Sequence, residues 1–415
     1  MIDWNLRNDQ AKLLFDQKKF KEAIQVLQES PTELLPNLAK CYYYNQEAPK
    51  ALECLEKYRS ATRDFSYDLQ IDEALYKNAI GLFEEAKEIL EILDSIKEDP
   101  RVKFNLGWHH LREGSFYRGF CHLIYGSKCR AWGNEYDYIE RGFLDPKKSW
   151  DGYHSVDKML FILEGGLGDQ IIFYRWNKLL SNFCKDLIVA CHPSLVRMFT
   201  NNKFDLSTNI IPLEQIGNIE YDVYVPSMNL PSIRDLGIYS PSSNVNFPYI
   251  TAEFNKYINR NVESLRSSSD KKFVIGFKWF GNPEFEHDQM RTVPEKPLKE
   301  IVSKHGQGIC LQFEDNDVTF PNAKGIITLW EDTCNLLRSV DITVTSCTSI
   351  AHLCGAMDLP CIVLVPLVPY FTWANDNLKW YRSIKIIRQD KYANWDSVFQ
   401  KLDNELLNFK KEREL

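Results

Sequence analysis

The chain has 415 residues, of which 44% are hydrophobic and 26% charged, an ordinary composition for a soluble globular protein of two or three domains. Its formal net charge of −7 gives no global attraction to nucleic acid or to anionic membranes. No apolar run approaches the roughly 20 residues that span a bilayer, and the amino terminus lacks the charged-then-apolar order of a signal peptide. The 11 cysteines form no CxxC pair, so we expect free thiols, a cytoplasmic location and no structural zinc.

Residues 1 to about 130 show helical periodicity and almost no strand signal. Within this stretch, a small residue recurs three positions after an aromatic or small residue. The first members of these pairs, at positions 20, 48, 83 and 116, are 28, 35 and 33 residues apart, close to the roughly 34 residues of a tetratricopeptide (TPR) helical hairpin. We expect an α-helical TPR-like domain with an aromatic connector over residues 1–150, and an irregular helical bundle is the alternative. The pairs are Phe20/Ala23, Ala48/Ala51, Phe83/Ala86 and Phe116/Gly119.

From residue 158 onward, short apolar runs alternate with helical stretches. This alternation is typical of parallel α/β architecture. The run 266–272 contains no apolar residue and is predicted to be a linker, so we expect two Rossmann-like domains, over residues 151–268 and 269–415, that face a cleft. Strands are predicted over 158–164, 187–191, 223–225, 273–279, 309–313, 326–329, 342–345, 362–365 and 384–387.

Residues 164–170 (EGGLGDQ) lie between the first predicted strand and a predicted helix. A strand, a glycine turn and a helix place backbone N–H groups at the carboxyl edge of a parallel sheet. The glycines permit a ligand to approach the backbone closely, and Asp169 would project a carboxylate into the crevice.

A second motif of this kind begins at residue 345 (TSCTSIAHLCGAM) and also follows a predicted strand. Hydroxyl groups such as those of Thr348 and Ser349 both cap helices and bind phosphate at helix N-termini. The alternative is a capped core helix with a buried His352.

Four further segments complete an ordered pattern over about 250 residues. With 164–170, this pattern resembles TPR-containing glycosyltransferases of the heptosyltransferase-like (GT-B) group. The resemblance implies an α/β GT-B fold of two Rossmann-like domains behind the helical domain, a nucleotide-sugar donor and inversion at the sugar carbon. The segments are 226–231 (PSMNLP), 279–283 (WFGNP), 288–294 (DQMRTVP) and 388–389 (RQ) with 395–396 (WD).

Two positions depart from that group. Cys347 stands where heptosyltransferases carry aspartate, so no carboxylate role is carried over to it. Lys278 stands where many relatives have an apolar residue, and we expect it to contact a donor phosphate.

Sugar transfer requires a base for the acceptor hydroxyl and stabilisation of the departing diphosphate. Asp169 is the candidate base, with helix capping as its alternative role and Glu164 as the reserve candidate. Arg291 is the catalytic candidate that neutralises the diphosphate, and an ion pair with Glu284, Glu286 or Asp288 is its alternative. The candidate donor-binding residues are Gly168, Lys278, Gln312, Thr348, Ser349 and His352.

A metal site is not expected, because Asp315-Asn316-Asp317 is typical of a turn and no Asp-x-Asp triplet ends a strand. We therefore predict an inverting, metal-independent glycosyltransferase that needs no cofactor besides a UDP-, ADP- or GDP-sugar co-substrate. A protein, a glycan or a hydroxymethylated DNA base could be the acceptor, and the helical repeats could hold it. The alternative function is a helical-repeat interaction adaptor with a degenerate, non-catalytic GT-B domain.

Overall fold

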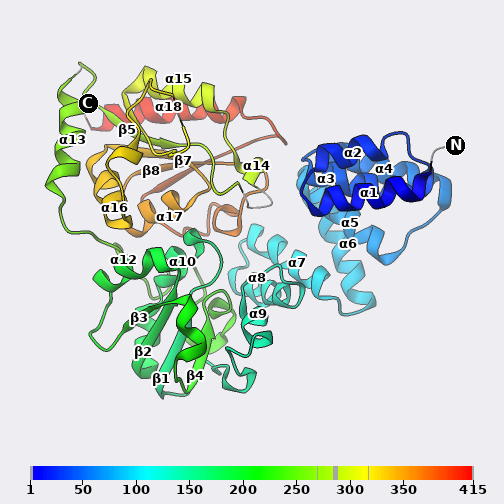
Figure 1. Cartoon of the computed structure of the whole chain (residues 1–415), viewed down its shortest axis with the longest axis horizontal. Helices are drawn as coiled ribbons and strands as arrows, with labels where there is room; N and C mark the ends of the chain where they lie inside the picture. Colours follow the sequence, from blue (N-terminus) through cyan, green and yellow to red (C-terminus); the bar gives the residue numbers. More distant parts are fainter. Residues whose placement is uncertain (1–2, 269, 284–287, 316, 414–415) are drawn as a thin grey trace.

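The computed structural model describes residues 3–268, 270–283, 288–315 and 317–413, and these residues form a helical region followed by two parallel β-sheets (Figure 1). Within residues 3–123, eight helices pair in sequence as four hairpins. The pairs are α1 (Trp4–Asp16) with α2 (Phe20–Leu27), α3 (Leu35–Tyr44) with α4 (Ala48–Thr62), α5 (Tyr67–Ala79) with α6 (Phe83–Ile96), and α7 (Pro100–Arg112) with α8 (Phe116–Leu123).

The recurring sequence pairs mark the same place in every hairpin. Each first member opens the second helix, and each small residue lies one turn later, where that helix packs on the first. Ala23, Ala51 and Ala86 are fully buried. A Cβ on Gly119 would lie 2.6 Å from Leu111 Cδ2 of α7, so that contact requires glycine.

The turns between the paired helices also repeat. In each turn, a residue with positive φ stands two positions before the second helix, and the N–H of the next residue donates to the carbonyl five positions back. This is the Schellman ending of a helix. Only two of the four turns have glycine at the residue with positive φ, so the sequence marks only these two turns with the residue typical of a helix end. The positive-φ residues are Lys18, Gln46, Gly81 and Gly114.

The first sheet has the strand order β3-β2-β1-β4, and its strands are parallel. Strand β3 is short, ends in proline, and was not predicted. The strands are β1 (Val156–Ile162), β2 (Cys184–Cys191), β3 (Asn209–Pro212) and β4 (Val223–Pro226), and the accompanying helices are α9 (Glu135–Glu140), α10 (Leu167–Tyr174), α11 (Asn177–Leu180) and α12 (Val196–Asn201).

The second sheet has the order β6-β5-β7-β8-β9 and is also parallel. The chain reverses its direction of travel across the sheet between β5 and β7, a switch point of the kind where open α/β sheets bind ligands. Its elements are β5 (Val274–Lys278), β6 (Gln307–Cys310), β7 (Ile342–Ser346), β8 (Cys361–Val365), β9 (Ile384–Arg388), α14 (Asp288–Arg291), α15 (Glu295–His305), α16 (Trp330–Ser339), α17 (Ser349–Ala356) and α18 (Asp396–Glu412).

The predicted strand at 326–329 is wrong. Ile326 follows a short 3-10 helix, and Leu329 is the N-cap residue of α16. The Asp332 carboxylate accepts the Leu329 N–H at 3.1 Å, which fixes this segment as the start of a helix.

Helix α13 (Lys256–Ser267) includes the first two residues of the predicted linker and packs against α16 of the second sheet. Arg266 forms an ion pair of 2.6 Å with Asp341, so the segment that begins at 266 is anchored to the second half. Within the described ranges, no helix has the length and apolar character to cross a membrane.

The loop after β8 joins all three parts of the molecule. The ring of Phe371 lies 5.7 Å from Phe120 of α8, 5.4 Å from Trp132 of the connector and 6.1 Å from Phe173 of α10. One continuous apolar core therefore holds the last hairpin, the first sheet and the second sheet together.

Candidate functional site

The two strand–turn–helix motifs meet at their helix N-termini. Helix α10 follows β1, helix α17 follows β7, and the two helices pack against each other between the sheets (Figure 1). A Cβ on Gly168 would lie 2.8 Å from His352 Cδ2 and 3.5 Å from the Cα of Ser349. Gly168 is thus placed beside two other candidate residues, and its lack of a side chain permits the close approach.

Asp169 is half-buried in the first turn of α10. Its Oδ2 accepts the Gly166 N–H at 2.9 Å, so the capping role expected as the alternative is present. Burial raises the pKa of Asp169 to about 6, against the opposing effects of the Gly166 N–H, the Tyr370 hydroxyl and the charge of Arg291. A carboxylate with this pKa is mainly ionised at neutral pH yet basic enough to accept a proton.

Glu164, the reserve candidate, is buried at the end of the first strand. Its carboxylate accepts the N–H of Asn134 at 2.5 Å, and its own N–H donates to the Ser227 hydroxyl at 3.0 Å. Burial raises the pKa of Glu164 to about 7. Because a Cβ on Gly133 would lie 2.8 Å from the carboxylate, Glu164 serves to hold the connector against the first sheet.

Arg291 connects α14 to the start of α17. Its Nε lies 2.7 Å from Asp288 Oδ1, and its Nη1 donates to the Cys347 carbonyl at 2.7 Å. The ion pair with Asp288 expected as the alternative is therefore present, whereas Glu284 and Glu286 lie outside the described residues. Arg291 also lowers the pKa of Asp169, so the cation and the candidate base share one electrostatic environment.

Thr348 and His352 are buried by internal contacts. Thr348 is the N-cap residue of α17, and its hydroxyl lies 3.0 Å from that of Thr345. The His352 ring stacks on Trp373 with centroids 5.0 Å apart, and its Nδ1 lies 3.2 Å from the Tyr381 hydroxyl. Burial lowers the pKa of His352 to about 3, so the ring is neutral. These contacts match the core-packing interpretation of the histidine.

Gln312 is fully buried and supports the loop that follows β5. Its Oε1 accepts the Phe280 N–H at 3.3 Å, and its Nε2 donates to Glu314 at 2.5 Å. Both ends of the amide are therefore engaged within the protein.

Lys278 and Ser349 keep donor groups for a ligand. Lys278 is the last residue of β5, and burial lowers its pKa. Its ammonium makes neither a hydrogen bond nor an ion pair with any residue that the structure describes. Ser349 begins α17 and is half-buried, with the backbone N–H groups of the helix start beside its hydroxyl. A cation and a helix N-terminus at a switch point are suited to bind phosphate.

Tyr370 belongs to this site, although no sequence motif indicated it. It lies five residues after β8, its hydroxyl lowers the pKa of Asp169, and its ring lies 5.6 Å from Trp108 of α7. The same loop is held by the helical region, where Asn375 donates to the Arg112 carbonyl at 2.6 Å. The helical region thus braces the loop that contacts the candidate base.

No group of three or more His, Cys, Asp or Glu side chains suited to hold a metal ion occurs among the residues described. Asp315 and Asp317 instead both contact the Lys299 ammonium, at 2.8 and 2.9 Å. Asn316, between them, lies outside the described residues.

No protein-family model and no curated protein matches the chain. Among solved structures, the chain is similar to the E. coli ADP-heptose LPS heptosyltransferase II, with a TM-score of 0.42 and 13% identity over 62% of this chain and 100% of that one. It is similar to a family 9 glycosyl transferase from Veillonella parvula, with a TM-score of 0.45 and 9% identity over 63% and 100%. It is also similar to TibC, an iron-containing dodecameric glycosyltransferase from enterotoxigenic E. coli, with a TM-score of 0.41 and 11% identity over 63% and 78%.

Proposed function

We propose that the protein is a glycosyltransferase that moves a sugar from a nucleotide-sugar donor to an acceptor hydroxyl. The observation that carries this proposal is the meeting of a basic carboxylate from the first sheet, Asp169, with the N-terminus of α17 and the cation Arg291 from the second sheet. An acceptor base and a diphosphate site must face each other for this reaction.

In the proposed reaction, Asp169 accepts the proton of the acceptor hydroxyl while the oxygen forms a bond to the anomeric carbon. The bond from that carbon to the diphosphate breaks, and the nucleoside diphosphate leaves with the electron pair. Because the attack and the departure occur on opposite faces in one displacement, the configuration inverts. The hydroxyl of Tyr370 lowers the pKa of Asp169 and so favours the ionised carboxylate that accepts this proton.

The departing negative charge is matched by groups on the second sheet. Lys278 and the helix start at Ser349 contact the diphosphate, and Arg291 holds the turn at Cys347 in place while adding positive charge. These groups supply the electrostatic stabilisation that a divalent ion provides in other transferases, so we propose metal-independent transfer in the cytoplasm.

An adaptor with a non-catalytic GT-B domain is the second candidate. It is favoured by Cys347, which is 4% exposed and whose pKa burial raises to about 12, so that this position provides no negative charge. The internal contacts of Thr348 and Gln312 also reduce the number of groups that remain for a donor.

A donor screen distinguishes the two candidates. The thermal stability of the protein is measured with UDP-, GDP-, ADP- and CMP-sugars, each with and without magnesium. We expect one nucleotide class to raise Tm without metal, and Lys278→Met to reduce the increase. If no donor raises Tm at millimolar concentration, the adaptor is the better account.

A further inference from the structure

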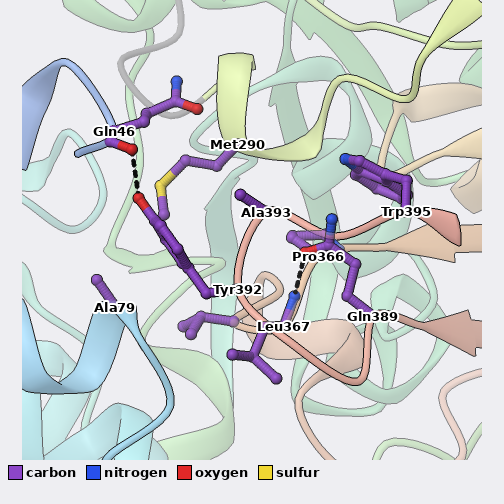
Figure 2. Close-up of a pocket in the computed structure, with 10 residues that line it drawn as sticks. Gln46, Ala79, Met290, Pro366, Leu367, Gln389, Tyr392, Ala393 and Trp395 are labelled. Atoms are coloured by element: carbon purple, nitrogen blue, oxygen red, sulfur yellow. Dashed lines mark hydrogen bonds between the residues drawn. The ribbon is translucent and has the colours of Figure 1, made fainter. Parts of the chain in front are cut away.

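A pocket of about 90 Å³ lies where the helical region meets the carboxyl edge of the second sheet (Figure 2). Its walls come from the turn of the second hairpin, the end of α5, helix α14 and the segments that follow β8 and β9. The lining residues are Gln46, Ala79, Met290, Pro366, Leu367, Val368, Gln389, Tyr392, Ala393 and Trp395.

One residue of the pocket lining carries a buried hydrogen-bond donor without a partner. Gln389 is 3% exposed, and its Oε1 accepts the Leu367 N–H at 3.1 Å. Since that contact fixes the orientation of the amide, Nε2 faces the other way, on the side of Ala393 in Figure 2. It has no acceptor among the residues described. A buried N–H of this kind favours a ligand that brings a carbonyl oxygen.

The lining also restricts the charge of a ligand. All of the described residues that form the pocket are neutral, so a phosphate or carboxylate would lose its hydration without gaining an ion pair. The ligand group that fits the pocket is therefore uncharged and carries one strong hydrogen-bond acceptor.

The volume restricts the size of a ligand. A cavity of about 150 Å³ accommodates benzene, which has six heavy atoms. A pocket of about 90 Å³ therefore holds a group of three or four heavy atoms, the size of a carboxamide and smaller than a sugar ring. Among the lining residues, Ala79, Val368 and Ala393 offer no side-chain hydrogen-bond partner for the hydroxyls of a sugar ring.

The pocket shares its walls with the candidate site. Met290 precedes Arg291 on α14, and the segment from Pro366 to Val368 continues to Tyr370. On the opposite wall, the Tyr392 hydroxyl donates to the Gln46 carbonyl, which joins the second hairpin to the segment after β9. An occupant would therefore contact the helical region and both segments that carry the site.

We propose that this pocket binds the carboxamide side chain of an asparagine or glutamine in a polypeptide that lies along the helical region. Its carbonyl accepts the Nε2–H of Gln389, and its methylene stem packs between Met290 and Leu367. Because the methylene stem is flexible, the carboxamide can enter this small pocket while the rest of the polypeptide stays outside. That this polypeptide is the sugar acceptor rests on the proposed function; the binding itself does not.

Methyl NMR of the whole chain labelled with ¹³C at its six methionine methyl groups tests the pocket directly. The Met290 signal is assigned from its loss in Met290→Leu. Titration with acetamide is expected to move this signal to saturation, whereas acetate, the charged analogue, is expected to leave it unmoved.

Two pocket variants and one control sharpen the result. Gln389→Leu is expected to weaken acetamide binding about fivefold, the loss of one hydrogen bond. Ala393→Leu, which leaves the Gln389–Leu367 bond intact, is expected to fill the pocket and abolish the shift. Lys391→Ala is the matched control in the same loop and is expected to bind as the parent does. Equal shifts with acetate, or acetamide binding unaffected by Gln389→Leu and Ala393→Leu, would overturn the proposal.

A second titration identifies the source of the amide. An asparagine blocked at both ends by acetyl and methylamide groups is expected to give the same Met290 shift at lower concentration than N-acetylglucosamine. Preference for the sugar would overturn the polypeptide assignment in favour of a glycan. These titrations contain no nucleotide sugar. If the Met290 signal does not shift but a nucleotide sugar still raises Tm, the pocket proposal is wrong and the transferase proposal still stands.

Discussion

The hydroxyl of Tyr370 helps to set the pKa of Asp169, and its removal has a calculable effect. Burial raises the pKa of Asp169 to about 6, while the Tyr370 hydroxyl and the charge of Arg291 lower it. A full hydrogen bond to a charged acceptor contributes about 1.5–3 kcal/mol, and we take the effect of the Tyr370 hydroxyl to lie near the lower limit of that range. Because about 1.4 kcal/mol corresponds to one pKa unit, Tyr370→Phe is expected to raise the pKa of Asp169 by about one unit.

The consequence is a shift of the acidic limb of the pH–rate profile by about one unit toward higher pH. At about pH 6, the ionised fraction of Asp169 falls from about one half to about one tenth, so kcat/KM falls about fivefold. Above about pH 8, the two proteins differ little.

The assay is nucleoside diphosphate release at donor concentrations below KM, where the rate reports kcat/KM, recorded across the acidic limb. Tyr257→Phe, at a tyrosine that is 63% exposed on α13, is the control. A Tyr370→Phe profile that is reduced equally at every pH, or that keeps its midpoint, would refute the role of this hydroxyl.

Three further predictions concern stability and binding. Gly168→Ala is expected to lower the free energy of unfolding, measured in urea, by about 1–3 kcal/mol, because the added carbon would lie 2.8 Å from His352. Gly325→Ala, where an added carbon would meet nothing within 4 Å, is the control. Equal losses of stability in the two variants would contradict the contact between α10 and α17. Lys278→Met is expected to weaken calorimetric donor affinity about tenfold relative to Lys272→Met, and unchanged affinity would place the diphosphate elsewhere. Folding raises the pKa of Asp169 from 3.8 to about 6, so the protonated carboxyl stabilises the folded protein. This stabilisation is complete below pH 3.8 and is lost as the pH rises to about 6. Asp169→Asn avoids this loss and is expected to be about 1 kcal/mol more stable at pH 7; parallel stability–pH curves for the two proteins would contradict the raised pKa.

The parts of the fold that the sequence predicts are those with local signals. Strand β8 is a continuous apolar run, β1 is one from Met159 onward, and the helical hairpins carry their small residues at the helix contact. The run at 326–329 is apolar too, but the Asp332 carboxylate caps the helix there, and that competing signal was missed. Strand β3, Asn209–Pro212, has only two adjacent apolar residues, Ile210 and Ile211, too few for an apolar run to appear.

The residues of the candidate site could also be predicted only in part from the sequence. The two strand–turn–helix motifs predicted that Gly168, Asp169 and the start of α17 lie at sheet edges, and the Gly168–Ser349 approach places them together. Tyr370 could not be predicted, because it depends on a loop that is positioned by Phe371 against three separate parts of the chain. Nor could the sequence predict that the Gln312 amide is engaged at both ends.

Release of nucleoside diphosphate from a nucleotide sugar in the absence of acceptor distinguishes a transferase that uses Asp169 as its base from a non-catalytic adaptor. The donor is the nucleotide class that raises Tm, and the proteins compared are the parent, Asp169→Asn and Asp186→Asn, an exposed aspartate on β2 that serves as the control. We expect slow release by the parent and the control, and release at the buffer rate by Asp169→Asn with donor binding retained. Equal release by all three proteins, or none by the parent, would contradict this expectation.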